Sequence, residues 1–207
     1  MCADCMQILW RVGVLSVLME IIGQKVIPAI ANEKDFEKFL ESKYTYCVIM
    51  NMNISQLGIL IDMAHKQKKK ALVHIDLIHG LANDEYGCEY TCQRLRADGV
   101  ISTKGKVVEM AKRNKKIAIL RLFLIDSKSL DKGLSLCNTV LPDYMEVLPG
   151  IADSIIPYIK SRVNVSIMSG GLIKTEEQID ACLNKGAIAV TVSDIKIAIK
   201  YLERDRG

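Results

Sequence analysis

Eight short runs of apolar, strand-forming residues alternate along this chain with segments that carry helix-start signals. Strict alternation of strand and helix with short connections predicts a parallel sheet, and eight such units predict its closure into a (β/α)₈ barrel of the TIM type. An open doubly wound sheet is the alternative. The eight runs are Val26 to Ile30, Tyr46 to Asn51, Ala71 to Ile78, Gly99 to Thr103, Ile117 to Ile125, Tyr144 to Leu148, Val165 to Ser169 and Ala187 to Ser193.

The length and composition fit one compact domain. At 207 residues, half of them apolar and a quarter charged, the chain can bury one complete core. This is short for a (β/α)₈ barrel, so we expect trimmed helices and loops. The barrel is expected to span residues 26–204. Residues 1–25 are expected to form an N-terminal extension, and Met19 is an alternative start of the chain. The apolar stretch Ile8 to Leu18 is interrupted by Arg11 and is too short to span a membrane.

The cysteines predict the compartment in which the protein works, and the net charge bears on whether it binds nucleic acid. The chain has seven cysteines, an odd number without framework spacing, which is typical of reduced thiols in the cytoplasm. Cys2 and Cys5 form a CxxC motif that would need a second pair of ligands to hold zinc, and no other spacing predicts a metal site. A net charge of +4 permits nucleic-acid binding without requiring it.

Two of the apolar runs end in small polar residues. Val165 to Gly171 reads VSIMSGG, and Ala187 to Ser193 reads AIAVTVS, with a helix between them that begins at a predicted capping box of Thr175 and Gln178. Small residues at a strand end let backbone N–H groups approach an anion closely. The last two units of a (β/α)₈ barrel commonly bind phosphate in this way. The predicted phosphate-binding residues are Ser169, Gly170, Gly171, Thr191, Val192 and Ser193.

Other runs carry polar side chains on the face that alternation would turn into the barrel. Asp76 shares a face with His74 in the third run, Arg121 lies in the fifth and Glu146 in the sixth. A single unpaired charge there would cost several kcal/mol, so we expect these charged groups to form a buried ion network. They either satisfy only one another or also hold the hydroxyls of a small ligand.

The residues expected to bind the remainder of a phosphorylated ligand, or to form the network, lie near the barrel mouth. His74 is deeper in its strand and is expected to be a hydrogen-bonded core residue, whereas His79 lies at the mouth. The predicted set is Asn51, Asp76, His79, Ser102, Arg121 and Glu146.

A barrel with a phosphate site is compatible with a small phospho-sugar isomerase, epimerase or lyase. A Schiff-base enzyme needs a lysine that projects inward from a strand, where desolvation lowers its pKa. Lys70 begins the third run at the wrong end, and Lys104 and Lys174 lie in loops after their strands. Proton transfer through Asp76 and Glu146 stays open, although an arginine between them would hold both ionised. The residues therefore favour a sensor over an enzyme.

Six segments in order carry a family resemblance. The chain resembles the bacterial glycerol uptake operon antiterminator regulatory proteins from about Ile27 to Tyr201. The N-terminal extension departs from the family pattern, and so does Asn51, where relatives more often carry an aspartate. The segments are HIDLIHGLANDEYGCEY (His74 to Tyr90), GVISTKG (Gly99 to Gly105), LRLFLIDS (Leu120 to Ser127), DYMEVLPG (Asp143 to Gly150), SGGLIKTEEQID (Ser169 to Asp180) and GAIAVTVSD (Gly186 to Asp194).

The resemblance implies a transcription regulator without catalytic residues or a further cofactor. It implies that glycerol-3-phosphate is the effector and that the partner is the leader mRNA of a glycerol-metabolism operon, whose premature termination the protein prevents.

An RNA-binding surface is suggested only by two basic runs, Lys66 to Lys70 and Lys112 to Lys116. Both lie at helix ends that enter strands, which places them on the amino-terminal face, opposite the mouth. Lysines there also complement helix dipoles, which is the alternative explanation. If they contact RNA, coupling to the ligand passes through the barrel or through a ligand-induced homo-oligomer. The predicted RNA-binding residues are Lys68, Lys69, Lys115 and Lys116.

Overall fold

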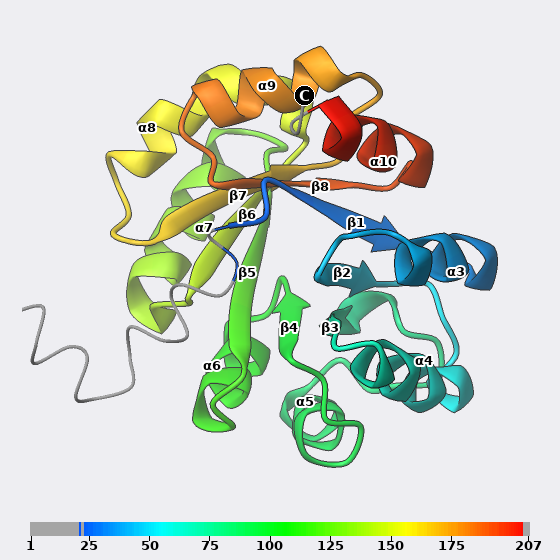
Figure 1. The fold of residues 1–207 in the computed structure, drawn as a ribbon. Helices are drawn as coiled ribbons and strands as arrows, with labels where there is room; N and C mark the ends of the chain where they lie inside the picture. The colour runs from blue at the N-terminus through cyan, green and yellow to red at the C-terminus, as the bar shows by residue number, and fades with distance from the viewer. Residues whose placement is uncertain (1–20, 22, 205–207) are drawn as a thin grey trace, which may run out of the picture.

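The computed structural model describes residue 21 and residues 23–204, and it places them in a closed barrel of parallel strands (Figure 1). Each strand pairs with the next in sequence, and β8 pairs with β1 to close the barrel. This confirms the (β/α)₈ barrel and excludes the open sheet. The strands are β1 (Val26–Ile30), β2 (Tyr46–Ile49), β3 (Lys70–His74), β4 (Gly99–Ser102), β5 (Ile117–Phe123), β6 (Tyr144–Leu148), β7 (Ser166–Gly170) and β8 (Ala189–Val192).

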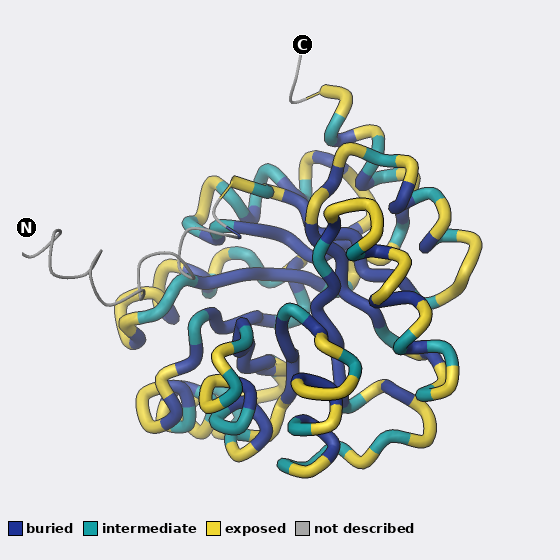
Figure 2. Tube along the Cα trace, turned by 60° about the horizontal axis from the view of Figure 1, so that its bottom comes forward, coloured by how far each residue is buried: buried dark blue, intermediate teal, exposed yellow. Residues whose placement is uncertain are grey.

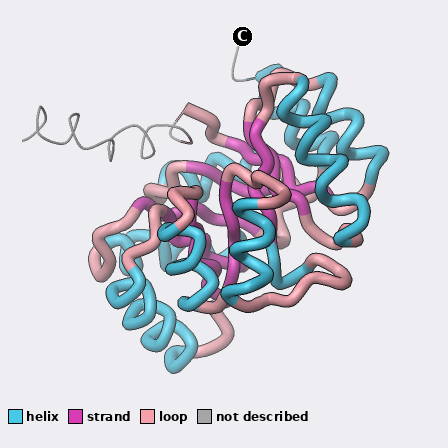
Figure 3. The backbone as a smooth tube through the Cα atoms, turned by 90° about the horizontal axis from the view of Figure 1, so that it is seen from below, coloured by secondary structure: helices cyan, strands magenta, loops and turns pink. Residues whose placement is uncertain are grey.

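A helix follows every strand and packs on the outside of the barrel, so that the strands form the centre of the view in Figure 3. Several helices have only nine residues and α8 has five, which is how a short chain completes the fold. The helices are α3 (Glu33–Glu41), α4 (Ile54–Lys66), α5 (Glu85–Gln93), α6 (Gly105–Arg113), α7 (Ser127–Val140), α8 (Ile156–Lys160), α9 (Glu176–Asn184) and α10 (Ile195–Arg204), with 3₁₀ turns η1 (Ile75–Leu77) and η2 (Gly150–Ile155).

The helix-start signals act as local chemistry predicts. The Asn32 side chain accepts a hydrogen bond from the backbone N–H of Asp35 at 2.9 Å and caps α3. Thr175 and Gln178 form the reciprocal capping box of α9. Each cap satisfies backbone N–H groups that the first helical turn leaves without partners, and contributes about 1 kcal/mol.

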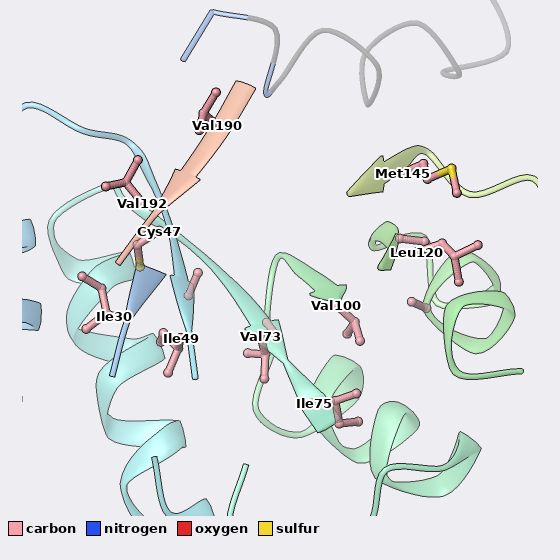
Figure 4. Packing of buried hydrophobic residues seen from close by; sticks show 14 of the residues in the cluster. Ile30, Cys47, Ile49, Val73, Ile75, Val100, Leu120, Met145, Val190 and Val192 are labelled. Atoms are coloured by element: carbon pink, nitrogen blue, oxygen red, sulfur yellow. The ribbon is translucent and has the colours of Figure 1, made fainter. Parts of the chain in front are cut away.

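Alternation along the strands divides the apolar residues into two cores. Inward residues such as Ile27, Leu72 and Ile119 fill the barrel, and the buried Ile21 packs with them. Outward residues, among them the labelled Val73 and Leu120 of Figure 4, pack against the helices. Figure 2 shows the result, with buried strands at the centre and exposed outer helix surfaces.

The third strand is shorter than predicted. The sequence suggested a strand from Ala71 to Ile78, but β3 ends at His74 and the chain turns into η1. The carboxylate of Asp76, in this turn, accepts hydrogen bonds from Ser102 and Thr103 at the end of β4. These bonds hold the turn against its neighbour, so Asp76 lies beyond the strand and not within it.

At the amino-terminal face, the Gln24 side chain links the first two strands. Its amide nitrogen donates to the carbonyls of Val26 and Tyr46, and its oxygen accepts from the N–H groups of Thr45 and Tyr46. Most of the predicted extension, residues 1–20 and 22, lies outside the described residues, as do Cys2 and Cys5. In residue 21 and residues 23–204, no helix is both long and apolar enough to cross a membrane.

Candidate ligand-binding site

A buried polar network occupies the carboxyl-terminal end of the barrel interior. Arg121 Nε donates to Glu146 Oε2 at 2.7 Å, and Arg121 Nη1 lies 3.0 Å from His74 Nδ1. Thr191 Oγ1 donates to the other carboxylate oxygen of Glu146 at 2.6 Å. Glu146 has no exposed surface and Arg121 exposes 8% of its own, so the ion pair is shielded from solvent.

Strand register explains why these side chains meet. Arg121 of β5 and Glu146 of β6 are direct partners in the parallel ladder, and both point inward because their neighbours Leu120 and Met145 point toward the helices. His74 of β3 and Thr191 of β8 complete the network from other parts of the barrel wall.

Asp76 does not join the Arg121–Glu146 pair, which corrects the predicted composition of the network. Its carboxylate lies 3.9 Å from the imidazole of His74, measured between Oδ2 and Nε2. The physical reason is the early end of β3, which carries Asp76 out of the strand and onto Ser102 and Thr103. Its place in the network is taken by His74, which the sequence assigned to the core.

Burial, and next to it the positive charge of Arg121, lower the pKa of His74 to about 4. The imidazole is therefore neutral near pH 7. Its Nδ1 is bonded to Arg121, but Nε2 is a buried atom with no hydrogen-bond partner among the described residues. The prediction that His74 is a fully hydrogen-bonded core residue is therefore wrong for one of its two ring nitrogens. Alternation did place it inward, which was the available sequence signal.

The predicted phosphate end is built by β7 and β8. Gly170 and Thr191 are paired residues of these strands. A Cβ on Gly170 would lie 1.9 Å from Thr191 Oγ1, so only glycine fits there. Gly171 has a φ of +78°, which also favours glycine. Ser169 Oγ is buried and donates to the carbonyl of Val147 at 3.3 Å.

The other two residues of the phosphate prediction lie differently from these. Val192 is buried and its side chain belongs to the outer core, so only its backbone is near the mouth. Ser193 is exposed in the loop before α10.

The remaining predicted mouth residues are divided between the interior and the rim. Ser102 is buried and donates to Asp76 at 2.7 Å. Asn51 is exposed after β2 with a φ of +54°, a conformation that asparagine tolerates better than most residues. His79 is exposed, and its backbone pairs with the loop after β2. Thr103, which the predictions omitted, is the second hydrogen-bond partner of Asp76.

The four lysines predicted to contact RNA lie in the two loops at the amino-terminal face, but they are not equivalent. Lys68 and Lys115 are exposed, and Lys116 is half-buried. Lys69 exposes 8% of its surface, and its ammonium donates to the carbonyls of Ser42 and Tyr44 at 2.7 and 2.6 Å. The ammonium is bonded to backbone carbonyls within the protein, so Lys69 does not face solvent, as contact with RNA would require.

No group of three His, Cys, Asp or Glu side chains in the described part of the chain is arranged to hold a metal ion.

Three solved structures show what this chain is similar to in sequence and fold. The chain is similar to the glycerol uptake operon antiterminator regulatory protein of Listeria monocytogenes str. 4b F2365, with 42% identity, a TM-score of 0.80, and 83% of this chain and 92% of that chain covered. A glycerol uptake operon antiterminator-related protein of Thermotoga maritima MSB8 is 25% identical, with a TM-score of 0.74 and coverage of 84% and 97%. An aldolase designated QR15 is 16% identical, with a TM-score of 0.68 and coverage of 91% and 98%, a likeness that shows the fold alone.

A family model described as glycerol-3-phosphate responsive antiterminator matches residues 26–197, which is nearly the whole barrel. Together with the similarity to the Listeria protein, this match shows that the chain belongs to the glycerol-3-phosphate responsive antiterminator family.

Proposed function

We propose that this protein is a cytoplasmic regulator that binds glycerol-3-phosphate in the barrel mouth and, in response, binds the leader mRNA of a glycerol-metabolism operon to prevent premature termination. One observation carries the proposal. Thr191 of β8 is paired with Gly170 at the end of β7, and its hydroxyl also belongs to the buried polar network through Glu146. The residues proposed to bind the phosphate and those proposed to bind the hydroxyls therefore share one mouth.

The two ends suit the two parts of the ligand. At the phosphate end, Gly170 leaves room for the Thr191 hydroxyl, and the two glycines place backbone N–H groups at the strand end, where such groups commonly bind anions. At the other end, the Arg121 contacts to Glu146 and His74 involve two of the five N–H groups of a guanidinium, which leaves donors for ligand oxygens. The ion pair with Glu146 keeps the guanidinium fixed in orientation.

The same residues argue against the enzyme alternative. Among the described strands, the only lysine is Lys70, at the amino-terminal start of β3 and far from the mouth. Both oxygens of Glu146 accept hydrogen bonds from protein side chains, so the carboxylate is engaged in the buried network. A panel of triose and pentose phosphates tested for turnover separates sensor from enzyme, since measurable conversion of any of them would favour the enzyme.

For RNA, the proposal uses Lys68, Lys115 and Lys116 and leaves out Lys69. The three lysines lie at the amino-terminal face, so the transcript and the ligand would occupy opposite ends of the barrel. Coupling between them would then act through the strands or through a ligand-induced homo-oligomer.

The deciding experiment measures the effector and the transcript together. Glycerol-3-phosphate is expected to raise the melting temperature in proportion to the logarithm of its excess, by the equivalent of about 2.7 kcal/mol at a hundredfold excess over Kd. Glycerol at the same concentration should give a much smaller shift. A leader transcript should bind more tightly when glycerol-3-phosphate is present. No change in melting temperature at millimolar glycerol-3-phosphate would contradict its proposed role as effector. Transcript affinity that is the same with and without glycerol-3-phosphate would contradict the proposed regulation.

A further inference from the structure

The Nε2 atom of His74 stands out among the buried polar atoms. His74 exposes 2% of its surface, and its Nε2 has no hydrogen-bond partner among the described residues. Buried polar groups nearly always have partners, so such an atom beside a binding site is a candidate ligand contact. Asp76 Oδ2 lies 3.9 Å from it, too far for a direct hydrogen bond.

The partner on the other ring nitrogen decides the tautomer. A guanidinium only donates, so His74 Nδ1, which lies 3.0 Å from Arg121 Nη1, must accept and carries no proton. The neutral ring then holds its proton on Nε2. Burial and the Arg121 charge, which lower the pKa of His74, keep the ring in this neutral form. The atom without a partner is therefore an N–H donor.

Asp76 supplies an acceptor beside this donor. Its Oδ1 accepts from Ser102 Oγ at 2.7 Å, and its Oδ2 accepts from the N–H and hydroxyl of Thr103 at 2.8 and 2.9 Å. A carboxylate has two lone-pair positions on each oxygen, so these three bonds fill Oδ2 and leave one position on Oδ1. A ligand hydroxyl that accepts from His74 Nε2 lies beside this carboxylate, because Asp76 Oδ2 is 3.9 Å from Nε2, and it can donate to the open position on Oδ1.

A donor and a carboxylate acceptor at one point select the chemistry of the bound group. A hydroxyl accepts from His74 and donates to Asp76. A carbonyl oxygen can accept from His74 but cannot donate, so its lone pairs would face the carboxylate. A phosphate oxygen would meet the same repulsion, which assigns the phosphate to the β7–β8 end of the mouth.

We propose that His74 Nε2 and the Asp76 carboxylate, through Oδ1, together bind one hydroxyl of a polyol phosphate and make the site select a hydroxyl over a carbonyl at that carbon. The inference rests on the proposed function, because it requires a phosphorylated polyol in the mouth. We assign this hydroxyl to C2, which is the carbonyl carbon of dihydroxyacetone phosphate, so the protein is expected to respond to glycerol-3-phosphate and not to this keto form.

The test is a calorimetric titration of the full-length protein with glycerol-3-phosphate, dihydroxyacetone phosphate and inorganic phosphate. Sites built to hydrogen-bond a hydroxyl reject analogues without it strongly, so the wild type should prefer glycerol-3-phosphate to the keto form by about 100-fold or more. His74→Leu should reduce this preference to less than about 10-fold. His74→Gln, whose amide can accept from Arg121 and donate to the ligand, should retain more of it.

The matched control is His65→Leu, which removes a histidine paired with Asp98 at 2.9 Å, away from the mouth, and should leave the preference unchanged. Inorganic phosphate reports whether each variant keeps a folded anion site. If His74→Leu does not fold, the wild-type preference and the His74→Gln variant decide.

The outcomes separate the two proposals. Glycerol-3-phosphate binding without preference over the keto form, or an unchanged preference in His74→Leu, would overturn the role of His74 and leave the effector proposal intact. If neither glycerol-3-phosphate nor inorganic phosphate binds the wild type, the proposed function fails and this inference fails with it.

Discussion

Replacing Glu146 with leucine is expected to lower the free energy of unfolding by about 3–5 kcal/mol. Glu146 has no exposed surface and accepts hydrogen bonds from Arg121 at 2.7 Å and from Thr191 at 2.6 Å. The substitution keeps the site filled but leaves a buried guanidinium without its carboxylate. Removing one partner of a buried pair is costly because the remaining charge stays desolvated.

The magnitude follows from the two lost partners. An uncompensated buried charge accounts for the main part of the cost, and the orphaned Thr191 hydroxyl adds about 1 kcal/mol or more. Domains of this size unfold with about 5–15 kcal/mol, so the variant should lose a large share of its stability. The double variant Arg121→Met/Glu146→Leu should recover much of the loss, because no charge is then left unpaired.

The assay is urea unfolding followed by circular dichroism, with the midpoint and slope fitted for each variant. Asp62→Asn is the control, because it breaks the Arg96–Asp62 pair at 3.2 Å, whose side chains are 68% and 53% exposed. The control should cost less than about 1 kcal/mol. A Glu146→Leu loss no larger than that of the control, or a double variant no more stable than the single one, would refute the burial argument.

Three further outcomes are expected. Burial and Arg121 lower the pKa of His74 to about 4 in the folded state. Below about pH 6.5 the unfolded chain therefore takes up a proton at this histidine while the folded chain does not. The free energy of unfolding should fall by about 3 kcal/mol from pH 6.5 to 4, as read from urea midpoints. Gly170→Ala places a Cβ 1.9 Å from Thr191 Oγ1, and should cost about 1–3 kcal/mol in unfolding free energy and weaken phosphate binding in calorimetry. Lys115→Glu should weaken transcript binding and flatten its salt dependence. Lys69→Met should chiefly lower the melting temperature, because the Lys69 ammonium is bonded to the carbonyls of Ser42 and Tyr44.

Each of these has its own control. His74→Leu should remove the part of the pH dependence that belongs to the histidine. Gly23→Ala, at a glycine where an added Cβ would have no atom of the described residues within 4 Å, should have little effect on stability. Lys128→Glu changes an exposed lysine at the start of α7, on the mouth side of the barrel. Equal losses of transcript binding in Lys128→Glu and Lys115→Glu would contradict the placement of RNA at the amino-terminal face.

The barrel and part of its interior could be predicted from the order of residues alone. Alternation of apolar runs and capped helices is a local property, and it fixed the order of the strands and the inward direction of Arg121 and Glu146. Adjacent parallel strands then brought these two side chains together. The need for a residue without a side chain at Gly170 agrees with the run of small residues in the sequence, whereas its predicted role in phosphate binding stays a prediction.

The contacts that depend on where a strand ends, or on which residues lie across the barrel, follow from the folded chain. β3 ends at His74, and the turn that follows places Asp76 against Ser102 and Thr103, which moves the carboxylate away from Arg121 and leaves the histidine in its place. Lys69 likewise reads as a surface charge in its basic run, yet it is buried because two backbone carbonyls lie within reach of its ammonium. Periodicity gives the direction of a side chain along its own strand, but its partner is set by residues distant in sequence that the closed barrel brings within hydrogen-bond distance.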